Sequence, residues 1–256
     1  MKSDKIINNR TSESVATSMS SLRKTSLVAG VLYLLTFVSI PTLALYSALR
    51  HPNYILGTGT ETPVIIGSVL EIIVALACIG SAVALYPVLK NQNEGLAMGL
   101  VCSRVLEAGT IFAGVCFVLT VVTLRQTGAG TEALVISNTL VTLYDRVFLI
   151  GQSFMPAVND IILGLLLYQS RLVPRSLAVI GLAGGLVLIV GDGSVLFGLI
   201  GQHAPITSLF AVPVAFFEFS LGSWLVAKGF NSPRVVEAPV QNLFKLAAGL
   251  KPELNP

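Results

Sequence analysis

Long apolar runs separated by short polar segments dominate the pattern of this chain. Each run holds 19 residues or more, close to the roughly 20 residues that a helix needs to cross the hydrocarbon layer of a bilayer. Backbone amides cannot stay unpaired in lipid, and the runs are much longer than barrel strands, so each is predicted to be a helix. The pattern therefore predicts an all-α polytopic membrane protein with six transmembrane helices in one bundle, at residues 27–46, 64–89, 96–124, 147–168, 177–200 and 209–227.

The segment before the fourth run has a different pattern. Apolar residues recur there at alternating spacings of three and four, which places them on one face of a helix; they are Ala133, Ile136, Leu140, Leu143 and Val147. This segment is either a short interfacial helix or an extension of the fourth span beyond the bilayer.

The two ends of the chain are polar. Residues 1–26 are Ser/Thr-rich and basic, without apolar periodicity, and are expected to form a flexible cytoplasmic tail. Residues 228–256 contain several prolines and are expected to form a second cytoplasmic tail, with one amphipathic turn around residues 243–250. The transmembrane domain is thus expected to cover residues 27–227.

Composition supports a membrane location. Hydrophobic residues make up 54% of the chain and charged residues only 11%, and the mean hydropathy is +0.81, whereas a soluble domain carries roughly a quarter charged residues. The net charge of +3 reflects basic ends rather than a nucleic-acid surface. The three cysteines lie within apolar runs and are interpreted as small core residues.

Basic residues are distributed unequally between the two sides. With the N-terminus inside, twelve Lys and Arg residues lie in the inner segments and three, Arg50, Arg125 and Arg146, in the outer ones. Cytoplasmic loops retain basic residues, so both termini are predicted to be cytoplasmic in a multi-pass protein of the cell membrane.

Six ionisable residues fall inside the predicted spans, where a charge costs a few kcal/mol on insertion scales. Together with one asparagine they form the candidate intramembrane polar cluster: Glu71, Arg104, Glu107, Asn159, Asp160, Asp192 and Glu218. Arg104 and Glu107 are three positions apart on one helix and are predicted to pair.

Two interpretations of this cluster remain open. The acids and Asn159 could face a shared cavity that binds a proton, an ion or a small polar ligand. Alternatively, they could form interhelical hydrogen bonds that only fix packing.

The region from Leu149 to Gly185 resembles a bacterial membrane family catalogued as domain of unknown function 4386. The similar features are Gly151 with Phe154, Asn159, Leu163-Gly164, Tyr168, Ser170, the turn Leu172-Val173-Pro174-Arg175 and the cluster Gly181 to Gly185. Further similarity lies in Arg23 with Ala29 to Tyr33, in Arg104 to Ala108, and in Glu218 to Gly222 followed by Lys228 to Phe230. The resemblance covers about residues 22–230 and implies a polytopic membrane protein with no established activity.

Arg171 and Arg175 flank the predicted turn at Pro174 on the inner side of the membrane. They are candidate anchors for anionic lipid headgroups, although a plain topological role is the favoured interpretation. Membrane lipids are the partners that the sequence predicts.

Enzyme motifs in the sequence are incomplete. Asp192 and Asp145 do not match the paired aspartates of intramembrane proteases, because Asp145 lies at the outer edge of a span. Ser194 with His203 lacks a supporting motif, and the two histidines lack metal-ligand spacing. We therefore assign no catalytic, cofactor or metal residue. A non-enzymatic protein that binds a small ligand, ion or proton for transport or sensing is the leading hypothesis; the alternatives are a structural or regulatory partner protein and a lipid-modifying membrane enzyme.

Overall fold

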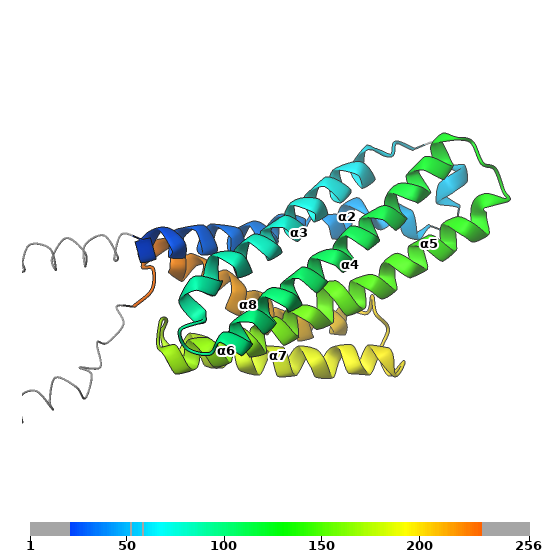
Figure 1. Cartoon of the computed structure of the whole chain (residues 1–256). Helices are drawn as coiled ribbons and strands as arrows, with labels where there is room; N and C mark the ends of the chain where they lie inside the picture. Colours follow the sequence, from blue (N-terminus) through cyan, green and yellow to red (C-terminus); the bar gives the residue numbers. More distant parts are fainter. Residues whose placement is uncertain (1–20, 52, 58, 232–256) are drawn as a thin grey trace, which may run out of the picture.

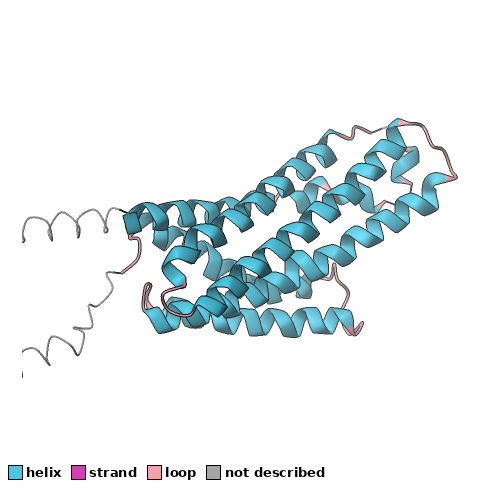
Figure 2. Cartoon of the chain, viewed as in Figure 1, coloured by secondary structure: helices cyan, strands magenta, loops and turns pink. Residues whose placement is uncertain are grey.

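The computed structural model describes residues 21–51, 53–57 and 59–231. Within these ranges the chain forms a bundle of helices joined by short loops, and no strand is present in this part of the chain (Figures 1 and 2). Six helical segments are long and apolar enough to cross a membrane, which confirms the predicted all-α, six-span fold. Their bounds are Ser21–Leu45, Thr62–Leu89 (α3), Glu94–Gln126 (α4), Ala133–Ser170, Arg175–Leu196 (α7) and Pro205–Ala227 (α8).

The first span is broken in its second half. Residues 21–35 are α-helical, and the chain then continues through the 3-10 turn η1 (Thr36–Ser39) and the short helix α2 (Thr42–Leu45). Pro41 lacks the N–H that a regular helix requires, and the hydroxyl of Thr42 donates to the carbonyl of Ser39 at 2.7 Å. Two further short turns, η2 (Ser47–Arg50) and η3 (Tyr54–Leu56), lead to α3.

The fourth span is one continuous helical segment of 38 residues. It consists of α5 (Ala133–Phe148), the π-helical segment η4 (Leu149–Phe154) and α6 (Met155–Ser170). Of the two alternatives for residues 133–147, the structure therefore has the extension of the fourth span. A 33-residue helix such as α4 is about 50 Å long, and α4 and α5 together project beyond the end of α7 (Figure 1).

Both described ends of the chain lie on the same face of the bundle. The guanidinium of Arg23 donates to the carbonyl of Leu225 at 3.0 Å, and the side chain of Asn231 donates to the carbonyl of Arg171 at 3.1 Å. We call this face, with the loops at residues 90–93 and 171–174, the terminal face. The described residues on either side of η3 (Tyr54–Leu56) and the loops at residues 127–132 and 197–204 lie on the opposite face.

Helix boundaries differ from the predicted ones by a few residues in every span, and by more at some ends. Residues 21–26 are helical rather than part of a tail, because Arg23 is held against the end of α8. Helix α4 extends past residue 124 to Gln126, and α7 ends at Leu196, shortly before Gly198, which has a φ of +70°. Residues 1–20 and 232–256, with the turn expected around 243–250, lie outside the described residues.

Candidate functional site

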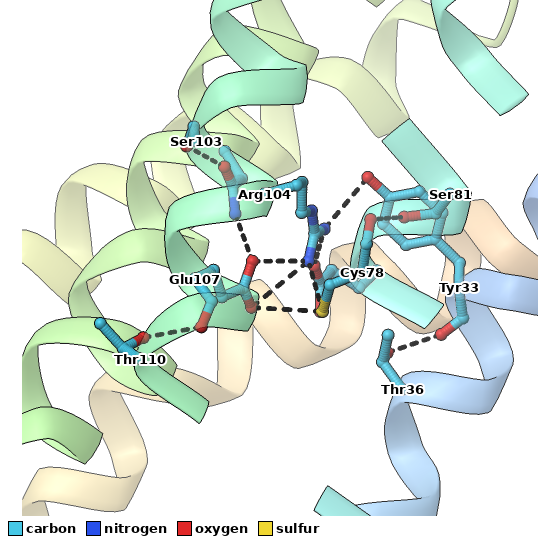
Figure 3. A network of polar contacts seen from close by, with 10 residues as sticks. Tyr33, Thr36, Cys78, Ser81, Ser103, Arg104, Glu107 and Thr110 are labelled. Carbon is cyan, nitrogen blue, oxygen red and sulfur yellow. Dashed lines mark hydrogen bonds and ion pairs between the residues drawn. The ribbon is translucent and has the colours of Figure 1, made fainter. Parts of the chain in front are cut away.

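Arg104 lies at the centre of a buried polar cluster on α4, and only 1% of its surface is exposed. Nη1 donates to Oε2 of Glu107 at 3.1 Å, and Nη2 donates to Oε1 of Glu218 at 2.6 Å. Nη2 also donates to the hydroxyl oxygen of Tyr33 at 3.1 Å, as Figure 3 shows from close by. One guanidinium therefore connects α4 to α8 and to the first span.

Glu107 is the second junction of this cluster. Its Oε2 accepts a hydrogen bond from Nδ2 of Asn159 at 2.7 Å, and the Asn159 Oδ1 accepts one from the hydroxyl of Ser103. The thiol of Cys78 lies 3.6 Å from Glu107 Oε1 and 3.6 Å from Arg104 Nη1. We use the name Arg104 cluster for the six residues from five spans that meet here: Tyr33, Cys78, Arg104, Glu107, Asn159 and Glu218.

Asp160 follows Asn159 on α6 and is fully buried. Neither of its carboxyl oxygens has a hydrogen-bond partner in the part of the chain that the structure describes. Asp160 is adjacent in sequence to Asn159, which contacts Glu107. Within the Arg104 cluster itself, two carboxyl groups contact one guanidinium.

Glu71 on α3 belongs to a separate group nearer the opposite face. Its Oε1 accepts hydrogen bonds from the hydroxyl of Tyr144 at 2.7 Å and from the amide of Gln152 at 3.5 Å. Its Oε2 accepts one from the hydroxyl of Tyr46 at 3.4 Å. The rings of Tyr46 and Tyr144 pack edge to face with centroids 5.5 Å apart, so at this site polar and apolar contacts together fix helix packing.

Asp192 on α7 forms a third, smaller group. Its Oδ1 accepts a hydrogen bond from the hydroxyl of Ser153 at 2.7 Å. Its Oδ2 is buried and has no partner among the described residues. Asp192 and Glu71 therefore do not join the Arg104 cluster directly.

The π-helical segment η4 connects these groups. Gln152 and Ser153 are consecutive residues of η4, and they donate to Glu71 and Asp192 respectively. Segments of π-helix are frequent at functional sites. Here the segment presents two adjacent polar side chains to two different acids.

A cavity of about 230 Å³ lies beside the Arg104 cluster. Its polar wall contains Arg104, Glu107 and Glu218, and Gln152 and Ser153 also line it. The remaining wall is largely apolar and includes Phe37, Ile40, Val74, Ile111, Leu188 and Val214. Three predicted residues thus face one cavity directly, and Glu71 and Asp192 are each linked to it through a single side chain of η4.

Glu218 has an unused hydrogen-bonding capacity at this cavity. Its Oε1 accepts from Arg104, whereas its Oε2 accepts no hydrogen bond from any described residue. The side chain is 12% exposed, against 5% for Glu107. Glu218 is therefore the acid of the Arg104 cluster that is best placed to meet a molecule in the cavity.

Sequence reasoning missed several members of the site. Tyr33, Cys78 and Ser103 were not predicted to contact the polar cluster, and Gln152, Ser153 and Tyr144 were not assigned to any site. Polar side chains inside apolar runs were the available signal, because each of them needs a partner in lipid. Cys78 is buried in an apolar cluster as expected, and it also contacts charged groups. Cys102 and Cys116 are exposed rather than part of the core.

The predicted lipid anchors lie on the terminal face. The guanidinium of Arg175 stacks over the ring of Tyr168, 4.8 Å from its centroid, and the carbonyl of Arg171 accepts from Asn231. Headgroup binding at these residues stays a prediction. Among the described residues, no group of three His, Cys, Asp or Glu side chains could hold a metal ion.

Comparison with known proteins identifies a family without an assigned activity. No curated protein and no solved structure matches the chain. The family model described as Domain of unknown function (DUF4386) matches residues 28–229, a range that includes most of the first span, the other five spans and every residue of the Arg104 cluster. The chain therefore belongs to the DUF4386 family.

Proposed function

We propose that the cavity beside the Arg104 cluster binds a small molecule that carries a cationic or hydrogen-bond-donating group. In this proposal the chain is a non-enzymatic membrane protein that transports or senses that molecule. The single observation that carries the proposal is the free Oε2 of Glu218 at the wall of a 230 Å³ cavity.

The charges around the cavity favour a cation. Arg104 already donates to two carboxylates and to the Tyr33 hydroxyl. The two carboxylates outnumber this single guanidinium. A second positive charge beside Glu218 would offset this excess, whereas an anion would increase it. A packing role alone does not account for an unpaired acceptor at the wall of an open space.

The size and lining of the cavity restrict the ligand further. Cavities that bind drug-sized molecules measure about 300–1,000 Å³, so 230 Å³ suits a smaller molecule. The apolar wall opposite Glu218 includes Phe37 and Val214. A small organic cation with an apolar body matches both walls.

The orientation is part of the proposal. Six described basic residues lie toward the terminal face, and three, Arg50, Arg125 and Arg146, lie toward the opposite face. By the positive-inside rule the terminal face is cytoplasmic. We therefore place the protein in the cell membrane with both termini inside, and with Arg171 and Arg175 close to anionic lipid headgroups.

Three probes of similar shape test the ligand class: benzylamine as a cation, benzyl alcohol as a neutral molecule and benzoate as an anion. Thermal unfolding of the detergent-purified protein is measured with each probe, because a ligand that binds the folded state raises the unfolding midpoint. We expect benzylamine to raise the midpoint most. Glu218→Gln should abolish this preference, and Glu94→Gln, at the exposed start of α4, should retain it. Equal shifts with all three probes, or no shift with any, would overturn the proposal.

A further inference from the structure

We propose that the ligand is a water-soluble cation that reaches the cavity from the opposite face, along a groove between the first span and α8. This inference rests on the proposed function, because it concerns access to the same site. It is carried by a second cavity, by the spacing of small residues on α8 and by the break in the first span.

The second cavity lies between the first one and the opposite face. It measures about 360 Å³, and its rim includes Arg50, Gln202 and His203. Ser153 and Ala211 line both cavities, so the two are adjacent and these two side chains mark the passage between them. The proposed route runs through the two cavities from the loop at residues 197–204 to Glu218.

One face of α8 follows this route. Ser208 lines the outer cavity, Ala211 lines both, and Ala215 and Glu218 line the inner one. These positions are separated by three, four and three residues, so they lie on one side of the helix. Ser208, Ala211 and Ala215 have small side chains, so they leave room along this side of the helix up to the Glu218 carboxylate.

The first span separates from α8 where the groove begins. Nearer the terminal face the two helices are in close contact, since a Cβ atom on Gly30 would lie 2.8 Å from the carbonyl oxygen of Gly222. At the end of this contact, Phe37 of the first span and Phe219 of α8 pack edge to face, with ring centroids 5.6 Å apart. Phe37 lies within η1, where the regular winding of the first span ends. Past it come Ile40 and Pro41, and the side chain of Ile40, which lines the inner cavity, is 60% exposed.

Polar side chains along the groove favour water over lipid inside it. Thr42 and Ser208 line the outer cavity, and Ser39 and Gln152 line the inner one. At the rim, Asp145 contacts Arg50 at 3.3 Å and His203 at 3.1 Å. The hydroxyls of Ser39, Thr42 and Ser208 each donate to a backbone carbonyl of their own segment, so their oxygens can still accept hydrogen bonds from water in the groove.

Cysteine labelling tests the route. Ser208→Cys, Ala211→Cys and Ala215→Cys are made singly in a chain whose native cysteines are replaced (Cys78→Ser, Cys102→Ala, Cys116→Ala). The matched control is Val212→Cys, next to Ala211 in sequence, with a native side chain that is 57% exposed and lines neither cavity. Thr131→Cys and Asn91→Cys, in exposed loops, report which side of the membrane the reagent reaches.

The reagents are two membrane-impermeant methanethiosulfonates, one with a trimethylammonium group and one with a sulfonate group. We expect both to label Ser208→Cys and Ala211→Cys from the side that labels Thr131→Cys, and to leave Val212→Cys unlabelled. At Ala215→Cys the cationic reagent should react at least tenfold faster than the anionic one, after normalisation to free cysteine. Adding Glu218→Gln should reduce this ratio severalfold.

Labelling from the terminal face, or only from the bilayer, would overturn the route. Labelling of Ala215→Cys from the side that labels Asn91→Cys would place access on the terminal face. Labelling of Ala211→Cys and Ala215→Cys only by lipid-soluble N-phenylmaleimide would place access in the bilayer. If replacing the cysteines impairs folding, Cys78 is retained. The mass of the intact protein then shows whether a second reagent molecule has been added. Benzylamine binding to purified protein without labelling would refute the route alone, and labelling without benzylamine binding would refute the proposed function.

Discussion

The guanidinium of Arg104 lies 2.6 Å from a carboxylate oxygen of Glu218, although 114 positions separate the two residues along the chain. This ion pair and the one between Arg104 and Glu107 are both deeply buried. Breaking a buried pair by removing one partner costs much more than the pair contributes, because an uncompensated charge remains. The Arg104 cluster is therefore expected to respond very unequally to substitutions of its different members.

Arg104→Met should be severely destabilising. It removes the guanidinium that forms ion pairs with both Glu107 and Glu218. The free energy of unfolding should therefore fall by about 3–5 kcal/mol. Unfolding in mixed detergent micelles measures the change. Lys90→Met, at an exposed position, is the control and should change stability by less than about 0.5 kcal/mol. Wild-type stability of Arg104→Met would show that the cluster is not paired as described.

Glu107 and Asp160 should differ in their response to loss of charge. Glu107 accepts hydrogen bonds from Arg104 and Asn159, so Glu107→Gln should lower the free energy of unfolding by about 1.5–3 kcal/mol. Asp160 accepts none from the described residues, so Asp160→Asn should lower it by less than about 0.5 kcal/mol. Both variants are compared in one denaturation series, and a reversed order would contradict the hydrogen-bond assignment.

Tyr144→Phe tests the group around Glu71. It removes the 2.7 Å hydrogen bond to Glu71 Oε1 and should cost about 1.5–3 kcal/mol, as for bonds to charged groups. In the variant that also carries Glu71→Gln, the additional cost of Tyr144→Phe should be smaller, because the two residues interact. Tyr86→Phe, whose hydroxyl makes an exposed 3.4 Å contact with Glu94, should have almost no effect. Full additivity of the Glu71 and Tyr144 substitutions would argue against their contact.

Gly151→Ala tests the close approach between η4 and α4. A Cβ atom at Gly151 would overlap the side chain of Thr110, and overpacking of this kind costs about 1–3 kcal/mol. A Cβ atom at Gly109 on α4 would meet no atom of the described residues within 4 Å, so Gly109→Ala should be neutral or stabilising by up to about 1 kcal/mol. Equal effects of the two substitutions would indicate that η4 and α4 are farther apart.

The orientation can be measured with fusions to the C-terminus in a bacterial host. A cytoplasmic terminus should give a fluorescent green-fluorescent-protein fusion and an inactive alkaline-phosphatase fusion. The expected result follows from the basic residues of the terminal face, such as Lys90, Arg171 and Lys228. An active phosphatase fusion would reverse the predicted topology and, with it, the side from which the groove opens.

The sequence predicted the spans better than the site. Apolar runs are a local property, and so is the spacing of Arg104 and Glu107, whose predicted pairing is confirmed at 3.1 Å. The contact with Glu218 depends on how α8 packs against the bundle, which no local pattern specifies. The separation of Glu71 and Asp192 from the Arg104 cluster also depends on packing, since it follows from how α3 and α7 face η4.

The groove could not be predicted for a related reason. A proline such as Pro41 is a local signal for a break in a helix, but only the three-dimensional structure shows that the break lies opposite the small residues of α8, Ala211 and Ala215. The fourth span was predicted to begin near Val147 because Asp145 and Arg146 interrupt the apolar pattern there. These charged residues are tolerated because Asp145 contacts Arg50 and His203 near the opposite face.

The π-helical segment η4 also sets the register of everything that follows it. A segment of this kind holds one residue more than a regular α-helical turn, and one residue corresponds to a rotation of about 100°. Winding the same residues as an ordinary α-helix would turn α6 about its own axis by that rotation. Asn159 would then leave its place beside Glu107, and its apolar neighbour Val158 would take that place. A single inserted residue thus allows α5 and α6 to satisfy different neighbours within one unbroken helix.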